Sequence, residues 1–402
     1  MAETPLAKAG EQPPHSRWLI ANLLAQISFG LLAMTLCLPS MQEWGAIFDT
    51  RQADVQLTFS GYVVAYGALQ LVYGPLSDRH GRKPILMLGL VVAGLASVMA
   101  ALANDITTLT AARILQGAGS AASMVVGRSM VQDLFSGPQR TRVMAYIGMA
   151  LGMCPPLATL IGGQIHVRYG WQTNFALLAL LALALLVATW RGLPRVAKPP
   201  APEGHWLRAM LNAYARLARE PRFLLYVTIL AATTATFYVF LGGAPIVLKG
   251  YGIGPDGIGW FIMAVPVAYI LGNFMTSRLI QQRGEKQVMA WGQALTLAGL
   301  VVMLGLGLAG FQTALAVALP LLLVGLGHGL LNPPALAGTV GVVPALAGSA
   351  AAVAGLMQQL TGATGGYLVG LVPHEGAVNL GWMMLGFALI AAVAQWALHP
   401  RR

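Results

Sequence analysis

Two side chains in this sequence, Arg113 and His328, have polar chemistry that contrasts with their apolar surroundings. Arg113 lies roughly two turns inside a long apolar run, about 10 Å from its start at 1.5 Å per residue. A guanidinium at that depth needs a polar partner, a wet cavity or a route back to the surface. His328 lies between Gly327 and Gly329, where an imidazole either switches its charge near neutral pH or bonds to a backbone carbonyl.

Carboxylates, the usual partners of such groups, are scarce in the chain. There are 13 Asp and Glu in all, and Asp54, Asp105 and Asp133 fall near the ends of predicted apolar helices rather than deep inside them. The sequence has no nucleotide-binding loop, no His-Glu-x-x-His motif and no convincing set of catalytic acids. We therefore predict that the protein is not an enzyme and has no cofactor and no metal site.

The apolar surroundings of these residues reflect the composition of the whole chain. Its 402 residues are 57% hydrophobic and 9% charged, whereas a soluble chain carries about 25% charged residues. Apolar runs of roughly 20 residues, enough to cross about 30 Å of hydrocarbon as a helix, repeat along the sequence. This pattern predicts an all-α polytopic membrane protein in the lipid bilayer. Its twelve predicted helices span about 18–39, 54–75, 84–103, 107–132, 141–164, 172–190, 223–247, 256–277, 287–309, 313–336, 345–372 and 378–398.

One long interruption, 191–221, separates six predicted helices from the other six. We therefore predict an N-terminal six-helix bundle at 1–190, a cytoplasmic linker, and a C-terminal six-helix bundle at 222–402. From Trp206 to Arg219 the linker alternates apolar and basic residues at helical spacing. This pattern favours an amphipathic helix at the membrane surface over the alternative, an unstructured basic linker.

The net charge of +11 is distributed unevenly along the chain. With the N-terminus inside, roughly 20 of the 24 Lys and Arg fall on the cytoplasmic side, and the outer loops contain Arg51, Arg168 and Lys249. This asymmetry predicts that both termini are cytoplasmic and that the number of helices is even. The charge thus indicates topology and contact with anionic lipid rather than a nucleic-acid partner.

A basic turn follows the second predicted helix of each half. The first runs from Gly74 to Lys83 and the second from Gly272 to Lys286, and the two glycines lie about half a chain apart. The spacing predicts an internal duplication of six helices plus six.

The first of these turns carries a specific motif. Residues 74–84 read Gly-Pro-Leu-Ser-Asp-Arg-His-Gly-Arg-Lys-Pro, and residues 113–119 read Arg-Ile-Leu-Gln-Gly-Ala-Gly. Both resemble signatures of the major facilitator superfamily. Tyr-Gly-Pro-Leu-Ser-Asp-Arg at 73–79 and Gly-Trp-Gln at 170–172 are most similar to the bacterial twelve-helix drug:proton antiporters of the Bcr/CflA type.

This resemblance implies two six-helix bundles that rock about a central site in alternating access. It also implies a multi-pass monomer in the bacterial inner membrane, with a small-molecule substrate and protons as partners. The expected function is export of a small amphipathic organic molecule, as in multidrug efflux. The alternatives are uptake or export of an endogenous solute such as a siderophore, with non-standard coupling, and, more remotely, a membrane sensor, for which neither terminus is long enough to add a signalling domain.

The resemblance further implies a conformational latch in the first turn. Asp78 is expected to stabilise the N-terminus of the helix that opens near Pro344, and Arg82 is expected to pair with Asp133. Such a cluster would hold the halves in the outward-facing state and break as they rock. The predicted latch residues are Gly74, Asp78, Arg79, Gly81, Arg82 and Asp133.

Two departures from the family pattern concern proton coupling. Thr35 stands in the first helix where many of these antiporters carry a carboxylate. Residues 158–163 keep the Gly-Gly pair of the helix 5 signature but lack the Pro that usually precedes it. The remaining candidates for proton coupling are Arg113, whose role the resemblance implies, and His328.

Polar and aromatic residues inside apolar helices should face the protein interior rather than lipid. For any single aromatic residue, core packing or an interfacial belt is the alternative. Aromatic walls, amides and an Arg without a deep carboxylate favour neutral or anionic substrates over strongly cationic ones. The predicted substrate-binding set is Asn22, Gln26, Tyr62, Tyr66, Gln70, Arg113, Gln116, Tyr146, Met149, Phe237, Tyr238, Tyr269, Asn273, His328, Asn332, Gln358 and Gln359.

Overall fold

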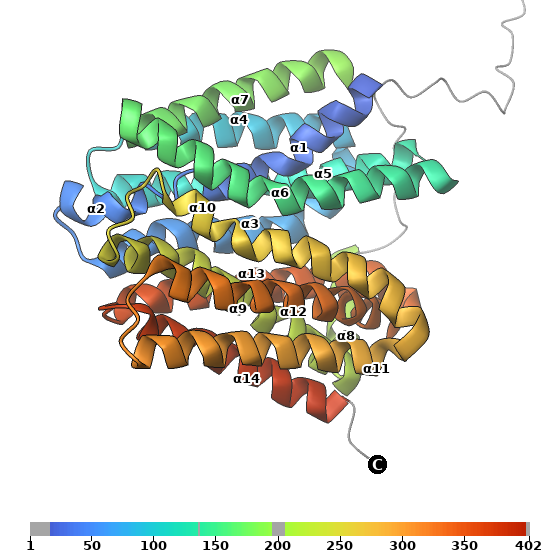
Figure 1. The fold of residues 1–402 in the computed structure, drawn as a ribbon. Helices are drawn as coiled ribbons and strands as arrows, with labels where there is room; N and C mark the ends of the chain where they lie inside the picture. The colour runs from blue at the N-terminus through green and yellow to red at the C-terminus, as the bar shows by residue number, and fades with distance from the viewer. Residues whose placement is uncertain (1–16, 136, 195–205, 399–402) are drawn as a thin grey trace, which may run out of the picture.

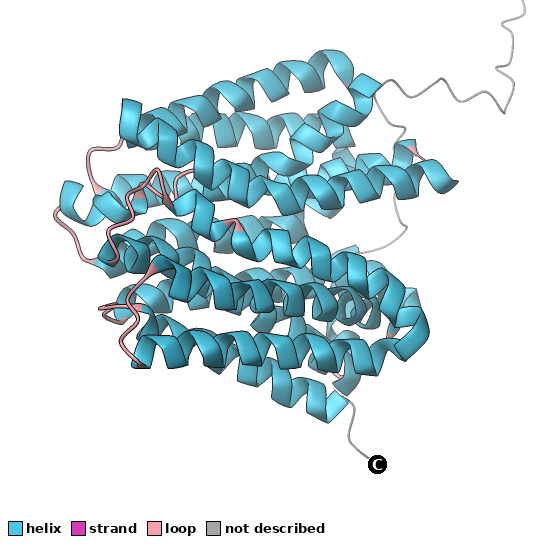
Figure 2. Ribbon diagram, in the orientation of Figure 1, coloured by secondary structure: helices cyan, strands magenta, loops and turns pink. Residues whose placement is uncertain are grey.

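The computed structural model describes residues 17–135, 137–194 and 206–398, and the regular elements in these ranges are all helical (Figure 2). The predicted all-α class is therefore confirmed. Residues 195–205 of the predicted linker, and Arg401 and Arg402, lie outside the described ranges. The helices are α1 (Arg17–Thr35), α2 (Met41–Ile47), α3 (Gln52–His80), α4 (Arg82–Ala101), α5 (Ile106–Leu134), α6 (Gly137–Tyr169), α7 (Trp171–Gly192), α8 (Trp206–Leu217), α9 (Pro221–Gly250), α10 (Ile258–Ile262), α11 (Ala264–Leu308), α12 (Ala314–Gly341), a short 3-10 turn (Pro344–Leu346), α13 (Ala347–Leu371) and α14 (Ala377–Leu398).

The long helices account for the membrane spans predicted from hydropathy. Nine segments in the described ranges are long and apolar enough to cross a membrane. One of them, Ile258–Leu308, has 51 residues, roughly 75 Å of helix and too long for one crossing. Gly284, with φ 74° and ψ 166°, divides it into two spans. α5 and α13, with 29 and 25 residues, are long enough but less apolar, and they bring the spans in the described ranges to twelve.

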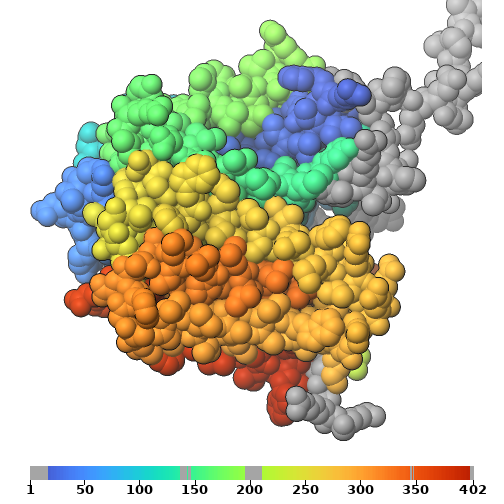
Figure 3. All heavy atoms as spheres, in the orientation of Figure 1, coloured from blue at the N-terminus to red at the C-terminus, as the bar shows by residue number. Residues whose placement is uncertain are grey.

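The spans form two groups that follow chain order (Figure 1). α1 and α3–α7 pack together in the upper part of the view, and α9 and α11–α14 pack together in the lower part. The groups meet mainly where α3 lies along α13 and where α6 contacts α10 and α11. The space-filling view shows the first group, blue to green, against the second, yellow to red (Figure 3). α1 begins and α14 ends at the same end of the molecule, as an even number of spans requires.

The outward-facing surface of these helices is apolar. Leu95, Leu180, Val393 and Trp396 are all more than half exposed. A protein surrounded by water rarely exposes such side chains in numbers, whereas lipid accommodates them. The chain is accordingly a multi-pass membrane protein.

The N-termini of α5 and α12 show that the two groups are built alike. Asp105 Oδ1 accepts the backbone N–H of Thr108 at 2.8 Å, and Thr313 Oγ1 accepts that of Ala316 at 3.2 Å. Both are N-caps, which satisfy a donor that has no partner inside the helix. The hydrogen bonds from Thr108 lower the pKa of the Asp105 carboxyl. A shift of 208 residues, from Asp105 to Thr313, thus relates equivalent positions in α5 and α12.

α8 occupies the segment whose sequence pattern predicts an amphipathic helix. It packs against α13, with Leu217 buried, Tyr214 half-buried and Arg216 exposed. Burial raises the pKa of the Tyr214 hydroxyl. Its contact with the membrane surface stays a prediction.

Candidate functional site

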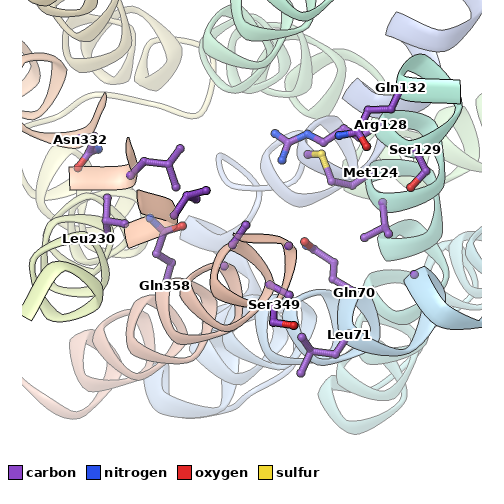
Figure 4. A pocket seen from close by; sticks show the side chains of 18 of the residues that line it. Gln70, Leu71, Met124, Arg128, Ser129, Gln132, Leu230, Asn332, Ser349 and Gln358 are labelled. Atoms are coloured by element: carbon purple, nitrogen blue, oxygen red, sulfur yellow. The ribbon is translucent and has the colours of Figure 1, made fainter. Parts of the chain in front are cut away.

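A cavity of about 1060 Å³ lies between the two groups of spans. α3 and α5 line it on one side, and α9, α11, α12 and α13 line it on the other. The cavity extends to one end of the molecule, where Tyr214 of α8 and Asp78, near the end of α3, line it. Figure 4 shows side chains from both groups facing this space. Its volume exceeds that of a typical drug-sized ligand site.

Part of the substrate-binding set predicted from the sequence comes together here. The cavity is lined by Gln70 of α3, Tyr269 and Asn273 of α11, Asn332 of α12 and Gln358 of α13. Asn273 Nδ2 donates to the carbonyl of Tyr269 at 3.1 Å, while Asn332 Oδ1 has no partner among the described residues. These amides give the cavity both donors and acceptors for a polar solute.

Arg128 is a charged cavity residue that the sequence interpretation missed. It projects from α5 beside Met124, Ser129 and Gln132 (Figure 4). Met124, Arg128 and Gln132 recur at intervals of four residues, which places them on one face of a helix. This spacing is the sequence signal from which Arg128 could have been predicted to line the cavity. Arg128 lies only about 9 Å from the end of α5, so its charge fits the positive-inside pattern equally well.

Side chains from both halves close the opposite end of the cavity. Gln42 Nε2 donates to the carbonyl of Pro245 at 2.6 Å, and Lys249 Nζ donates to the carbonyl of Gln42 at 2.8 Å. Nearby, Gln56 Nε2 donates to the carbonyl of Gly242 at 2.9 Å. Each bond joins α2 or α3 of the first group to α9 of the second.

Close backbone contacts add to this closure. A Cβ at Gly370 of α13 would lie 2.8 Å from Cα of Ala53 in α3, so only glycine fits. Gly163 of α6 likewise lies directly against the carbonyl of Pro255. The structure is therefore open at the α8 end and closed at the α2 end.

Arg113 lies away from the cavity, inside the first group of helices. Its side chain is fully buried, and it donates to the carbonyls of Ala33 at 2.8 Å and Met34 at 3.3 Å. These carbonyls lie where α1 ends, a point at which helix acceptors lose their internal partners. The guanidinium also lies 4.3 Å from the ring centroid of Tyr62, within cation–π range. The expectation that Arg113 lines a wet cavity is not met in this conformation, because the end of α1 supplies its partners.

Other amides of the predicted set also join helices within the first group. Asn22 Nδ2 donates to a carbonyl of α7 at 3.0 Å, and Gln26 Nε2 donates to Thr189 Oγ1 at 2.8 Å. Gln116 accepts from Arg113 and donates to Ser97 Oγ at 2.7 Å. An unpaired amide in an apolar interior is costly, so these side chains bond to the nearest groups of neighbouring helices.

Four of the remaining predicted residues form aromatic and amide contacts outside the cavity. Tyr62 and Tyr66 stack with ring centroids 5.9 Å apart, and Tyr62 Oη donates to the carbonyl of Gly30 at 2.7 Å. Tyr238 Oη donates to Gln359 Oε1 at 3.0 Å. The sequence spacing that puts Tyr62 and Tyr66 on one helix face is correct, but that face packs on α1.

His328 and three further residues also lie outside the lining. His328 is 4% exposed on α12, and its Nε2 has no partner in the described part of the chain. The adjacent Gly329 lets the backbone of α11 approach closely. Tyr146 and Phe237 are half-buried, and Met149 is 54% exposed on α6.

The turn between α3 and α4 contains a cluster of charged residues. Arg82 Nε lies 2.9 Å from Asp133 Oδ2, as expected, and Arg82 also pairs with Asp78. Asp78 lines the cavity mouth together with Ser349 of α13. In this conformation its carboxylate is paired with Arg82 of its own half, rather than with the helix start near Pro344. The turn itself depends on Gly81, whose φ of 98° favours glycine.

Two helix groups around a central cavity, closed at one end and open at the other, define a secondary transporter that works by alternating access. Residues 18–366 match the Major Facilitator Superfamily. The chain belongs to this superfamily, and it is a transporter and not an enzyme.

Curated relatives cover nearly the whole chain. Multidrug resistance protein D of Escherichia coli (strain K12) is 26% identical over 388 residues, 95% of this chain and 96% of that protein. The chloramphenicol resistance protein of Pseudomonas aeruginosa is 29% identical and covers 93% of this chain and 88% of its own length. A bicyclomycin resistance protein homolog of Haemophilus influenzae is 27% identical, with coverage of 93% and 96%. The Bcr/CflA-like resemblance is thus confirmed.

Solved structures share the fold at low sequence identity. A D-xylose-proton symporter superposes with a TM-score of 0.75 at 17% identity, covering 96% of this chain and 98% of that one. A bacterial homolog of the human lysosomal transporter Spinster superposes with a TM-score of 0.76 at 13% identity, covering 96% and 97%.

Proposed function

We propose that this transporter exports a small amphipathic organic molecule from the cytoplasm, across the bacterial inner membrane, in exchange for protons. The observation that carries the proposal is the central cavity, open at one end and closed at the other. Its lining of amides, aromatic rings and apolar side chains suits an amphipathic solute. The names of the relatives, which refer to resistance to drugs, support a drug or a drug-like metabolite as the substrate.

The open end of the cavity is assigned to the cytoplasm. Arg79, Arg82 and Lys83 lie at this end, and the positive-inside rule places such clusters inside the cell. Both α1 and α14 also have their terminal ends here. The protein would then receive its substrate from the cytoplasm in the conformation described, as an exporter requires.

The moving units would be the two six-helix bundles, 1–190 and 222–402, joined by the linker 191–221. In the opposite conformation the contacts of Gln42 and Gln56 would break, and the α8 end would close. Asp78 would then reach the N-terminus of α13, and the cluster at Arg82 would act as the predicted latch. This assignment fits the place of Asp78 at the cavity mouth, which Ser349 of α13 also lines.

The candidates for proton coupling lie outside the cavity in this conformation. Thr35 Oγ1 donates to the carbonyl of Leu31 in its own helix at 2.8 Å, and a hydroxyl of this kind does not titrate near neutral pH. Arg113 and His328 remain the candidates for coupling, and both are buried away from the cavity. If either residue couples protons to transport, it does so through a change in helix packing.

A reversible crosslink at the closed end tests the alternating-access part of the proposal. The pair Gln42→Cys and Lys249→Cys places one thiol on α2 and one on α9 at the closed end, while the native Cys37 and Cys154 are buried. In proteoliposomes with an imposed pH gradient, a short bifunctional thiosulfonate that joins the two thiols through disulfides should abolish transport of chloramphenicol or a fluorescent drug, and a reductant should restore it. The single Gln42→Cys variant, treated in the same way, is the matched control.

Two results would contradict the proposal. Transport that continues after complete crosslinking would show that the closed end does not have to open. Accumulation of substrate in the direction opposite to that of an exporter, in vesicles of known orientation, would favour the uptake alternative.

A further inference from the structure

The two walls of the cavity differ in chemistry at equivalent positions. With the shift of 208 residues that relates α5 to α12, Arg128 corresponds to Leu336, and Gln132 corresponds to Val340. All four residues line the cavity. Towards the open end the fold therefore places Arg128 and Gln132 of α5 opposite the apolar Leu336 and Val340 of α12. One turn deeper the polarity is reversed, with Met124 on α5 and Asn332 on α12.

Arg128 is available to a ligand. None of the hydrogen bonds or ion pairs in the described part of the chain engages its guanidinium, which is exposed to the cavity. The other charged residue of the lining, Asp78, is already paired with Arg82. Asp133, five residues further along α5, is paired with Arg82 as well. Within the described ranges, the cavity thus has a cation whose charge no neighbouring carboxylate balances.

The surroundings of Arg128 favour a particular ligand group. A guanidinium presents its donors in a fork that matches a carboxylate or a similar oxyanion. Ser129 and Gln132 add a hydroxyl and an amide on the same face of α5 (Figure 4). Across the cavity, Leu230 and Leu336 offer apolar surface.

We infer that the cavity binds amphipathic monoanions, with the anionic group on Arg128 and the apolar body against α12. This inference rests on the proposed export function, because it identifies the substrate class of the same cavity. It makes Arg128 the residue that determines charge selectivity. A cationic drug would be disfavoured, since it would face the unpaired guanidinium at close range.

The test compares three probes of one shape: naphthalene acetate, its neutral amide, and a naphthylmethyl trimethylammonium ion. Binding to the purified full-length protein in detergent is measured by calorimetry at pH 7. The wild type should bind the carboxylate about tenfold to a hundredfold more tightly than the amide, as expected for a charge-assisted hydrogen bond. The ammonium ion should bind most weakly.

Three variants distinguish the role of Arg128 from a general change in the cavity. Arg128→Gln should reduce the preference for the carboxylate to about one, because the carboxylate loses its charged donor and the amide can still bond to the Gln side chain. Arg128→Lys should keep part of the preference, because the charge remains and the fork geometry is lost. Leu336→Gln should lower the affinity for the carboxylate probe and for the amide probe by the same factor, because the two probes share the same apolar body.

The inference is overturned if Arg128→Gln keeps the full preference, if the ammonium ion binds best, or if the wild type binds none of the probes. The export proposal is assessed separately. Energised transport of a neutral drug that persists in Arg128→Gln would leave that proposal intact whatever the charge selectivity. Selective binding by a wild type that moves no substrate would contradict export and leave the assignment of Arg128 standing.

Discussion

Gly81 in the first half and Gly284 in the second both have a positive φ, 98° and 74°, and each joins the second span of its half to the third. The shift of 203 residues between them aligns the rest of the two turns. Asp78 then corresponds to Gln281, and Arg82 corresponds to Glu285. The backbone shape is therefore shared, while the charges are removed or reversed.

The comparison shows that the reversal of the chain depends on the glycine, while the proposed latch depends on the charged residues around it. A positive φ at glycine is sufficient to reverse the chain between two spans. The ion cluster of Arg82 with Asp78 and Asp133 has no counterpart at Gln281 and Glu285 within the described residues. In the second half, Glu285 instead accepts a hydrogen bond from Tyr226 Oη at 2.6 Å. The cluster is thus a specialised feature of the first half, as expected for a device that acts on only one side of the cavity.

The same asymmetry extends into the helices. Arg113 of α5 corresponds to Leu321 of α12, and both side chains are fully buried. Ser120 corresponds to His328, and both of these are buried as well. Replacing a residue of one half with the residue at the equivalent position of the other half therefore tests which of these differences transport requires.

The largest effect is expected from Arg113→Leu, which gives α5 the residue of α12. It would remove the guanidinium donor from the carbonyls of Ala33 and Met34 and leave Met34 only the weak thiol donor of Cys37. A lost hydrogen bond to a buried group costs about 1–3 kcal/mol. We expect unfolding in detergent to occur at a clearly lower temperature, with transport lost. Leu321→Met, a swap of similar volume, is the matched control and should cost less than about 1.5 kcal/mol. Equal unfolding temperatures for the two variants would contradict this account of Arg113.

Asp78→Asn should have the next largest effect, on transport rather than on stability. The substitution removes the charge that the latch requires and keeps the size of the side chain. We expect the transport rate in proteoliposomes to fall about tenfold, the equivalent of roughly 1.4 kcal/mol, with little change in unfolding temperature. Gln281→Asn in the second half is the control and should transport at the wild-type rate. If Asp78→Asn also transports normally, the latch interpretation fails.

The sequence predicted the helices better than it predicted the lining of the cavity. Length, hydropathy and charge asymmetry determine where a span lies, and they required no knowledge of neighbouring helices. The two basic turns compared in the sequence begin at Gly74 and Gly272, whereas the shift of 203 residues between Gly81 and Gly284 pairs Gly74 with Ser277. The glycine that matters for the turn is the one with positive φ, and sequence alone does not show which that is.

The cavity residues were harder to predict because a polar side chain inside a span can either line the cavity or bond to a neighbouring helix. Gln70 and Asn273 are related by the same shift of 203 residues, and both face the cavity. Gln26 is equally polar but bonds to α7. The choice depends on which neighbouring helix offers a free carbonyl or hydroxyl, and that is a property of tertiary packing. Arg128 was overlooked for a related reason, since its position near a helix end fits topology as well as binding.

A smaller effect is expected from His328→Ser, which gives α12 the residue of α5. The smaller side chain should cost about 1 kcal/mol through the space it leaves. Of the two coupling candidates we favour Arg113, which bonds to the end of α1, over His328, whose Nε2 has no partner in the described part of the chain. We therefore expect the number of protons exchanged per substrate, measured by proton flux after a pH jump, to stay at the wild-type value. Ser120→Ala is the matched control in the first half. Loss of coupling in His328→Ser alone would identify the imidazole as the proton switch.

The smallest effect concerns two lysines that follow the equivalent glycines, Lys83 and Lys286. Lys83 Nζ donates to the carbonyls of Trp190 at 2.8 Å and Leu193 at 2.9 Å, at the C-terminal end of α7. A cation there complements the partial negative charge of the helix end, at about 0.3–1 kcal/mol. Lys286 is exposed and has no such bond within the described residues. Lys83→Gln should therefore lower the unfolding temperature slightly and more so at low salt, while Lys286→Gln should leave it unchanged. Equal shifts for the two variants would mean that both lysines act only through the general positive charge of the cytoplasmic face, and that the contact with α7 contributes no stability of its own.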